Sequence, residues 1–435
     1  MAGEFPSRKV IAAHQLGQLR QLLTAVLPRN AFYQGKCAGL GPAVASLEDF
    51  SRRFPFTTKS ELAADQRAHP PYGGNLTYPL EKYTRFHQTS GTSGVPLRWL
   101  DTPEGWGWMV ENWVEVFRAA GVTAGDRVYF AFSFGPFIGF WLAYEAAQQL
   151  KCLCLPGGGQ GSAGRLRSIC ENKATVLCCT PSYAARLAEV AEEEKINLHG
   201  SAIRCIIVAG EAGGSIPATR QRLGQLWPGA RIFDHHGMTE TGPVSHECPA
   251  RPGMLHILEA AILAEVIEPD GSPVTPGQPG ELVLTTLGRW GSPVLRYRTG
   301  DLVRAVHFDT APCACGRHDL GLQGGIIGRT DEMVIVRGVN VYPTAIEEIV
   351  RGFAEVAEYE VQVDKSASLA ELMLRIEPQS GCGDPDALAG RVQGALQAAL
   401  NLRVPVMVAS AGSLPRFEMK AKRWKSGFEP GKETT

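Results

Sequence analysis

The sequence has no strong excess of charge, no long apolar run and no sign of an export leader. Its net charge is −1 over 435 residues, which argues against a general nucleic-acid-binding surface. No stretch approaches the roughly eighteen apolar residues that a membrane-spanning helix needs. The first residues, MAGEFPSRKV, lack the apolar core of a signal peptide. We therefore expect a cytoplasmic protein with no membrane or nucleic-acid partner.

Disulfides are not expected either, although the sequence contains eleven cysteines. Buried reduced thiols are the favoured interpretation for those in apolar, strand-like runs. These are Cys152, Cys154, Cys178, Cys179 and Cys205. The hydrophobic share of 44% and the charged share of 20% are ordinary for a globular protein. The chain is too long for one core, so two or three domains are expected.

Short apolar runs alternate with helical patterns in the first half of the chain. A helix is expected to begin at Pro103, capped by Thr102. RVYFAF, CLCLP, TVLCCT and IRCIIVAG are each followed by a helical pattern, and RIFDHHG closes the series. This alternation is typical of βαβ units around a parallel sheet. Ligands bind beyond the carboxyl ends of such strands. The loops expected to gather there are 88–96, 133–137, 156–161, 210–214 and 235–243.

The pattern changes after about residue 255. Segment 260–287 has β-type runs separated by Asp-Gly and Pro-Gly turns, which predicts an antiparallel or barrel-like subdomain. From residue 328 onward, strand and helix patterns, including a helix at 385–400, predict a compact α+β unit that follows a hinge near 329–332. The predicted fold class is therefore α/β, with a large N-terminal domain (1–328) of parallel sheets and a β-barrel-like subdomain. A small α+β C-terminal domain (329–435) follows.

The segment HQTSGTSGVP (87–96) is rich in glycine and hydroxyl side chains. Small residues allow close backbone approach, and hydroxyl and main-chain N–H groups can hold phosphate oxygens. The candidate phosphate contacts are Ser90, Gly91, Thr92, Ser93 and Gly94. A Walker loop is excluded, because no lysine follows the second glycine. An ordinary turn is the alternative interpretation.

The segment HHGMTETGP (235–243) places a carboxylate just past a predicted strand. Glu240 lies between Thr239 and Thr241, an arrangement suited to a magnesium ligand beside hydroxyl donors to phosphate. The alternative is a capped turn with a solvated Glu240.

The segment RYRTGDL (296–302) places a second carboxylate after a glycine. Asp301 could bind both hydroxyls of a ribose, as acidic residues do in dinucleotide-binding folds. An ion pair with Arg296 or Arg298 is the alternative.

Together with GRTDEMVIVRGVNVYP (328–343), these motifs resemble the adenylate-forming superfamily of acyl-CoA synthetases, adenylation domains and luciferases. The order TSGTSGVP, TPSY, GE, GMTETGP, RYRTGD, CACGR, GRTDEMVIVRGVNVYP and PRFEMKAKRW is similar to that of the phenylacetate-CoA ligase group, over about residues 40–425. The resemblance implies that a carboxylate attacks the α-phosphate of ATP, giving an acyl-adenylate and pyrophosphate. Coenzyme A thiol then displaces AMP. Between the steps a mobile C-terminal domain would rotate about Asp331.

The resemblance also implies roles for single residues. The hydroxyl-rich loop would hold the β- and γ-phosphates, Thr239 would contact the α-phosphate, and Glu240 would hold magnesium. Asp301 would bind the ribose with help from Arg329. Adenine would be framed by residues at two strand ends: Gly210, Glu211, Asp234, His235 and His236. The family often has an aromatic residue where this chain has His236.

A lysine near the C-terminus would supply the positive charge that the phosphate loop lacks. In the family that the chain resembles, such a lysine neutralises charge developing at the α-phosphate. Lys420 occupies that place here, after Met419 where a glycine is usual. Lys422 is the competing candidate, since both lysines would point to the same face of a strand.

Cysteine and histidine residues form a second signal. Cys313 and Cys315 in CACGRH, with Cys248 and His256 in HECPARPGMLH, can form a tetrahedral zinc site, and the phenylacetate-CoA ligase group has a similar pattern. The site would be structural, because four protein ligands leave no open position. His246 is a competing ligand. Four unrelated buried residues are the alternative interpretation.

The acyl pocket is expected beside 130–141, 208–214 and 234–238, by comparison with the same family. Gly237 and three aromatic residues, Phe132, Phe134 and Phe137, would line it, with Phe140 as a further candidate. Such a lining favours a small aryl or arylacetic acid. Core packing is the alternative role for these rings.

The expected cofactors are ATP, Mg2+, coenzyme A and a structural Zn2+, and the expected partner is a small carboxylic acid. A homodimer is left open. Two other functions also stay open. One is adenylyl transfer to a cofactor, or acyl transfer to a carrier protein, in place of coenzyme A. The other is a catalytically silent, zinc-stapled binding subunit.

Overall fold

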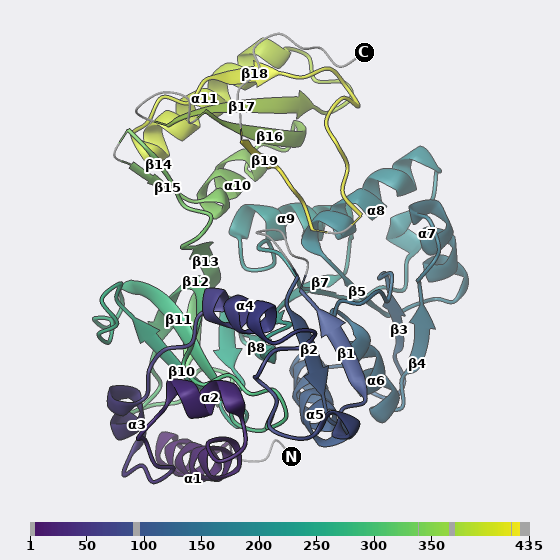
Figure 1. Ribbon diagram of the computed structural model, residues 1–435. Coiled ribbons are helices and arrows are strands. Elements are labelled where there is room, and N and C mark those ends of the chain that lie inside the picture. The colour runs from purple at the N-terminus through teal and green to yellow at the C-terminus, as the bar shows by residue number, and fades with distance from the viewer. Residues whose placement is uncertain (1–4, 90–95, 338, 365–369, 419, 427–435) are drawn as a thin grey trace.

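The computed structural model describes residues 5–89, 96–337, 339–364, 370–418 and 420–426. A small C-terminal α+β domain lies at one end of a large N-terminal region (Figure 1). The α-helices are α1 (Arg8–Val26), α2 (Ala31–Lys36), α3 (Leu47–Arg53), α4 (Lys59–Ala68), α5 (Pro103–Ala119), α6 (Trp141–Gln149), α7 (Ser162–Glu171), α8 (Pro181–Glu193), α9 (Pro217–Leu226), α10 (Pro343–Arg351) and α11 (Pro385–Leu400). Two 3-10 turns are η1 (Leu80–Lys82) and η2 (Leu198–Gly200).

The strands of the large region are β1 (Arg85–Gln88), β2 (Arg98–Asp101), β3 (Arg127–Phe130), β4 (Leu153–Pro156), β5 (Val176–Cys179), β6 (Cys205–Val208), β7 (Arg231–Met238), β8 (Gly242–Cys248), β9 (Arg251–Ile257), β10 (Ile262–Ile267), β11 (Pro279–Thr286), β12 (Tyr297–Val306) and β13 (Gly321–Arg329). The strands that follow the large region in the chain are β14 (Val334–Val336), β15 (Val339–Val341), β16 (Val356–Asp364), β17 (Glu371–Pro378), β18 (Val406–Val408) and β19 (Trp424–Ser426).

One sheet of eleven strands runs through the large region, in the order β10-β11-β12-β13-β9-β8-β7-β6-β5-β3-β4. Strands β4, β3, β5, β6 and β7 pair in parallel, which confirms the prediction from the alternating apolar runs. The strands from β7 to β10 pair antiparallel. β7 joins the two halves, because its first residues pair with β6 and its last with β8.

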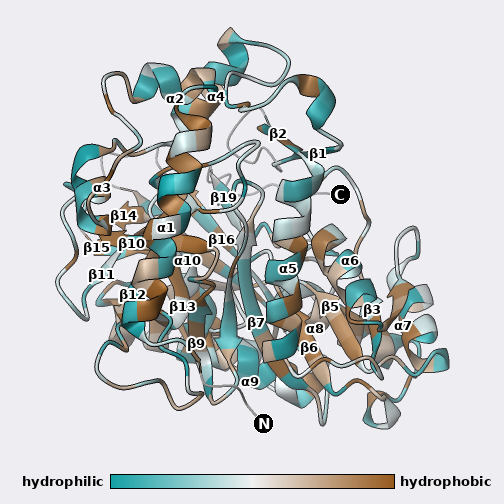
Figure 2. Ribbon diagram, turned by 90° about the horizontal axis from the view of Figure 1, so that it is seen from below, coloured by the Kyte–Doolittle hydropathy of each residue, from teal (hydrophilic) through white to brown (hydrophobic). Residues whose placement is uncertain are grey.

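Helices cover both faces of the parallel half. α5 and α6 pack with the sheet in one buried cluster, and α7, α8 and α9 pack on the other side in a second. Figure 2 shows the apolar strands between these helices. β5 and β6 are buried at every position, as expected for strands covered on both faces. α5 begins at Pro103 as predicted, and the Thr102 hydroxyl caps it by accepting the Gly105 N–H at 3.2 Å.

The surroundings of two expected loops, 235–243 and 88–96, differ from the expectation. Segment 235–243 is mostly strand: β7 continues to Met238 and β8 begins at Gly242, because antiparallel pairing supplies hydrogen-bond partners that a local pattern does not reveal. β1 is not part of the large sheet and pairs with β2. These two strands flank the hydroxyl-rich segment, whose residues Ser90–Gly94 lie outside the described residues.

The small domain has a four-stranded sheet, β18-β17-β16-β19, and its own core, which includes residues of α10 and α11. α11 matches the predicted 385–400. β19 was not predicted, because three residues show too little alternation. In Figure 1 the segment before β19 leaves the small domain and turns beside α8. The predicted hinge at 329–332 falls between β13 and β14.

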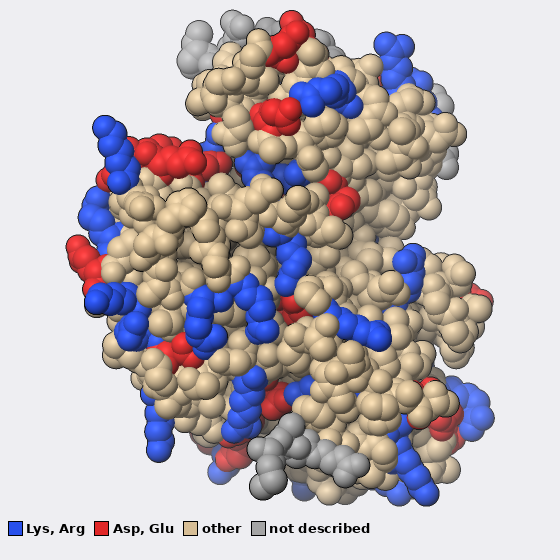
Figure 3. Space-filling view, turned by 180° about the vertical axis from the view of Figure 1, so that it is seen from behind, with Lys and Arg blue, Asp and Glu red and all other residues tan. Residues whose placement is uncertain are grey.

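Acidic and basic side chains are interspersed on the face shown in Figure 3. Among the described residues, no helix combines the length and apolar character needed to cross a bilayer. All eleven cysteines are free, and of the five in apolar runs Cys152, Cys178, Cys179 and Cys205 are buried and Cys154 is half-buried.

Candidate active site

Asp301 and Arg329 face each other across neighbouring strands. They are paired in the register of β12 and β13, and the Arg329 guanidinium donates to Asp301 Oδ1. His236 Nε2 lies 3.1 Å from Asp301 Oδ2. Burial raises the pKa of Asp301, but His236 and Arg329 outweigh burial and lower it below its ordinary value. Asp301 is therefore an ionised carboxylate held in a fixed orientation.

The alternative ion pairs considered for Asp301 are wrong. Arg296 pairs with Glu265 and Arg298 pairs with Glu281. Both arginines therefore have other carboxylate partners, one of them on β11.

The other predicted hinge-side residue is tied to this pair. Arg329 Nε and Nη2 donate to the two oxygens of Asp331 at 2.9 and 3.0 Å. Opposing the effect of burial, Asp301 and Asp331 raise the pKa of Arg329 above its ordinary value. The guanidinium thus joins the ribose candidate to the segment between the domains.

His236 and Asp234 lie on the same face of β7, because side chains alternate along a strand. The Ser215 hydroxyl donates to Asp234 Oδ2 at 2.5 Å. A Cβ at Gly214 would lie 2.4 Å from Asp234, so the 210–214 segment approaches this strand end closely. The structure therefore brings two of the predicted adenine-framing segments together.

His235 lies on the opposite face of β7. Its ring packs on Trp113, with 4.2 Å between ring centroids, and its Nδ1 lies 2.7 Å from the Ser245 carbonyl oxygen. Burial lowers the pKa of His235 to about 3, so the ring is neutral. Its side chain is part of the core, and any contact with adenine from this position would come from the backbone.

The turn between β7 and β8 holds Thr239 and Glu240. Glu240 is only 5% exposed, so the solvated alternative is wrong. Its Oε1 accepts from the Tyr297 hydroxyl at 3.3 Å and lies 3.8 Å from Lys59 Nζ. Lys59 and Tyr297 were missed in the sequence, because Lys59 belongs to no motif and the chemical signal of RYRTGDL lay in Asp301 rather than in Tyr297.

A buried ion pair anchors the same turn. Arg289 donates to the Thr239 carbonyl oxygen at 2.7 Å and to both oxygens of Asp101 at 2.7 and 2.8 Å. The side chains of Arg289 and Asp101 are 1% and 0% exposed. Such two-point pairs fix geometry as well as charge. No sequence pattern reveals this pair, because its members are 188 residues apart.

Lys420 reaches this region from the small domain. A Cβ built at Gly210 would lie 3.6 Å from Lys420 Cε. The N–H of the next residue, Ala421, donates to Glu211 at 2.7 Å. Lys420 is exposed, yet the surrounding protein lowers its pKa, against the opposing effect of the Glu211 and Glu240 carboxylates.

Lys422 cannot be compared with Lys420 in the way the sequence suggested. Residues 420–423 do not form a strand, since β19 begins at Trp424. The premise that both lysines share one face of a strand is therefore wrong. The side chain of Lys422 is exposed.

The predicted aromatic residues form a cluster at the start of α6. Phe134 lies 5.6 Å from Phe132 and 4.9 Å from Trp141 between ring centroids. Phe140 is buried in the main core, as the packing alternative states. Phe132 and Phe134 are half-buried and pack against the same core, and Phe137 is half-buried. Gly237 lies in the β7–β8 hairpin, where a Cβ would come within 2.9 Å of the Gly242 carbonyl oxygen.

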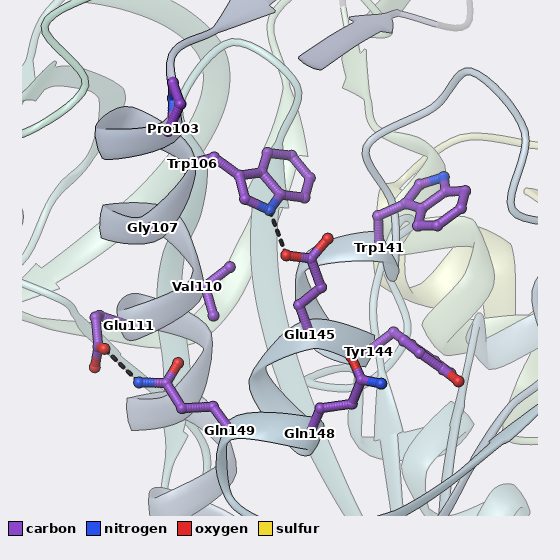
Figure 4. A pocket seen from close by; sticks show the side chains of 10 residues that line it. All are labelled: Pro103, Trp106, Gly107, Val110, Glu111, Trp141, Tyr144, Glu145, Gln148 and Gln149. Atoms are coloured by element: carbon purple, nitrogen blue, oxygen red, sulfur yellow. Dashed lines mark hydrogen bonds between the residues drawn. The ribbon is translucent and has the colours of Figure 1, made fainter. Parts of the chain in front are cut away.

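A hollow of about 540 Å³ lies between α5 and α6 (Figure 4). Glu145 lies between Trp106 and Trp141, and it accepts from Trp106 Nε1 at 2.7 Å. Trp141 and Tyr144 also contact Phe134. Among the described residues, none of the predicted nucleotide contacts lines this hollow. It therefore lies behind the aromatic cluster.

Four metal-ligand candidates come together within 4.8 Å of one another: Cys248, His256, Cys313 and Cys315. The Sγ atoms of Cys248 and Cys313 are 3.7 Å apart, and Cys315 Sγ is 3.4 Å from His256 Nε2. Zinc–sulfur bonds of about 2.3 Å in a tetrahedron require spacings of this size. The four side chains therefore lie close enough to share one ion, and the described cluster contains His256 rather than His246.

Residues 87–288 match the family described as AMP-binding enzyme, and residues 338–425 match the AMP-binding enzyme C-terminal domain. The phenylacetate-coenzyme A ligase of Pseudomonas putida is 31% identical, over 96% of this chain and 94% of its own. That of Thermus thermophilus is 33% identical, over 85% of this chain and 82% of its own. This chain belongs to the phenylacetate-CoA ligase family. It is an AMP-forming acid–CoA ligase, which activates a carboxylic acid with ATP through an acyl-adenylate.

Two solved structures of another ligase indicate how the two domains of the present chain are arranged. The 2-hydroxyisobutyryl-CoA ligase in its postadenylation state matches with a TM-score of 0.92 at 28% identity, covering 98% of this chain and 91% of its own. The same ligase in the thioesterification state, with coenzyme A, gives 0.73 at 29% identity, covering 97% and 91%. Because both structures are of one ligase, the difference reflects domain arrangement. The domain arrangement of this chain is therefore more similar to the postadenylation state of that ligase than to its thioesterification state.

Proposed function

We propose that the acid substrate is a small aryl or arylacetic acid. The half-buried rings of Phe132, Phe134 and Phe137 support an aromatic ligand, since aromatic pockets stack and enclose rings. The Pseudomonas putida relative is a phenylacetate-coenzyme A ligase. Short hydroxy acids are the second candidate, because the 2-hydroxyisobutyryl-CoA ligase takes a non-aromatic acid.

One observation carries the proposed chemistry: residues from several distant segments meet around one place. The charges that act on Lys420 are those of Glu211, Glu240, Arg329 and Asp301. In this arrangement Asp301 would bind the ribose hydroxyls and Thr239 would contact the α-phosphate. Lys420 would stabilise the negative charge that develops there when the carboxylate attacks. Asp331 would be the hinge, and 328/329 the domain boundary.

Glu240 fits a magnesium ion that binds with ATP. Magnesium sites commonly use one or two carboxylates together with phosphate oxygens, and Glu240 is a buried carboxylate in the turn beside Thr239. When bound, the ion would neutralise part of the phosphate charge. Lys59 would lie at the edge of this charge cluster, 3.8 Å from Glu240.

The Cys/His cluster fits a structural zinc ion. His256 Nδ1 lies 3.2 Å from the Asp319 carbonyl oxygen, which leaves Nε2 free to face the thiols. Burial raises the pKa of the Cys248 thiol to about 12, so this thiol would lose its proton and become a ligand only when a cation binds. Metal analysis of protein purified without chelator should find one zinc per chain, and Cys315→Ser should lose it. If zinc-free wild-type protein had the same melting temperature as protein with zinc, the site would be excluded.

A pyrophosphate-release screen over aromatic, arylacetic and short aliphatic acids tests the substrate. We expect release with aryl or arylacetic acids, and thioester only after coenzyme A is added. Release without any coenzyme A-dependent thioester would favour transfer to a cofactor or carrier protein. ATP binding without release over the whole panel would favour a silent binding subunit. A preference for short hydroxy acids would replace the aromatic proposal.

A further inference from the structure

Glu211 connects the two domains directly beside Lys420. Its Oε1 accepts the N–H of Ser182 at 2.8 Å, and its Oε2 accepts the N–H of Ala421 at 2.7 Å. The residue before it, Gly210, has a φ of 95° and lies against Lys420. One carboxylate oxygen therefore binds the large domain, and the other binds the residue that follows the lysine.

The contact with Ser182 orients this carboxylate independently of the small domain. Ser182 lies in the first turn of α8, where backbone N–H groups have no partner within the helix. The neighbouring Tyr183 N–H is taken by the Thr180 side chain. Glu211 thus supplies an acceptor that α8 needs in any domain arrangement, and its second oxygen stays directed toward the tail.

Other contacts between the tail and the large domain run through side chains. Arg416 Nε donates to Glu189 at 3.1 Å, and Glu418 accepts from the Ser162 hydroxyl at 2.8 Å. Long side chains can follow a moving backbone, so these bonds restrain the main chain only loosely. The bond from Glu211 to the Ala421 N–H acts on the backbone itself, one residue from Lys420.

We propose that Glu211 is a positioning residue for adenylation. It holds the main chain at Ala421, so that the Lys420 ammonium stays in the site during the first half-reaction. When the small domain rotates, this bond opens and the carboxylate keeps its contact with α8. The inference rests on the role proposed above for Lys420. It gives the side chain of Glu211 a task other than framing adenine.

The variant Glu211→Gln tests this role with little change in shape. Glutamine has one carbonyl oxygen and one NH2 group, so it cannot accept from both N–H groups. We expect the kcat of ATP–pyrophosphate exchange to fall by about tenfold or more, as loss of a charge-assisted hydrogen bond implies, with the KM for ATP within about twofold. Thioester formation from supplied acyl-adenylate should not fall. A raised KM for ATP with unchanged kcat would overturn the proposal.

Glu355→Gln is a matched control. Glu355 pairs with Arg391 at 2.8 Å within the small domain, and both side chains are exposed. The variant removes a carboxylate that takes no part in the contacts between the two domains. Both half-reactions should therefore have the rates of the wild type. Thermal unfolding of each variant shows whether it is folded.

A double-mutant cycle separates this inference from the proposed function. If Glu211 acts through Lys420, Glu211→Gln should cause no further loss of adenylation in a Lys420→Ala background. An equal loss in both backgrounds would overturn the role of Glu211 and leave that of Lys420 intact. Normal adenylation by Lys420→Ala alone would overturn both.

Discussion

Asp301 and Lys420 reach the same site from two regions that are held in different ways. Asp301 belongs to the large sheet, where strand register places Arg329 opposite it. Arg289 and Asp101, which are almost fully buried, anchor the nearby turn. Lys420 belongs to a tail whose ion pair to α8, between Arg416 and Glu189, leaves both side chains about a fifth exposed, at 23% and 22%.

This difference would suit the proposed rotation of the small domain, which takes the site apart between the two half-reactions. Buried two-point pairs are expensive to separate, because an unpaired charge would remain in the protein interior. Polar contacts between partly exposed side chains can be replaced by contacts with water at little cost in free energy. The nucleotide side of the site can therefore stay rigid, while the lysine side can leave. The 2-hydroxyisobutyryl-CoA ligase has been solved in a postadenylation and a thioesterification state, with TM-scores of 0.92 and 0.73 to this chain.

Breaking the rigid side should have the largest effect. Asp101→Ala would leave Arg289 buried without its partner, so the free energy of unfolding should fall by about 3–5 kcal/mol. Denaturant unfolding measures the change. The control Glu194→Ala removes an exposed partner of Arg167 and should cost less than about 1 kcal/mol. Equal stabilities for the two variants would contradict the proposed contrast.

Removing the mobile lysine should affect chemistry without affecting stability. Lys420→Ala should lower the adenylation rate by about 10²–10³-fold, the usual result of removing one group that stabilises transition-state charge. Thioester formation from supplied acyl-adenylate should stay near the wild-type rate, and so should the free energy of unfolding. Lys422→Ala is the control and should behave as wild type. Reversed results for the two lysines would transfer the role to Lys422.

The pH dependence of adenylation should report the surroundings of the lysine. The pKa of Lys420 is lowered by desolvation, so its ammonium form is lost at a lower pH than for a free lysine, about 10.4. Because kcat/KM reports the free enzyme, its alkaline limb should lie below that value. Lys420→Arg, if active, should move the limb to higher pH. A wild-type limb at or above 10.4 would show that desolvation is unimportant.

Loosening the tail should have the smallest effect. Glu189→Gln removes the negative charge on α8 that pairs with Arg416 but leaves Arg416 paired with Glu377 in the small domain. Adenylation should slow by less than about fivefold, since partly exposed pairs contribute about 0.2–1 kcal/mol. Thioester formation should be unchanged or slightly faster. Glu193→Gln, which affects a pair within α8, is the control. A loss as large as that of Lys420→Ala would show that the tail is not loosely held.

Local patterns in the sequence determined the parallel half of the sheet and the starts of α5 and α11, and they singled out Glu240 and Asp301 as candidates. The predictions of these elements are confirmed because apolar periodicity and helix caps act over a few residues. The same patterns singled out the cysteines and His256, although their meeting in space was only a hypothesis.

Tertiary structure alone decided which partners these residues have. It turned His235 into the core, paired Arg289 with Asp101, brought Lys59 to Glu240 and placed Glu211 on the backbone beside Lys420. Each of these contacts joins distant segments or depends on the face of a strand. Strand register and domain arrangement set such contacts, and both are properties of the packed chain rather than of any short stretch of sequence.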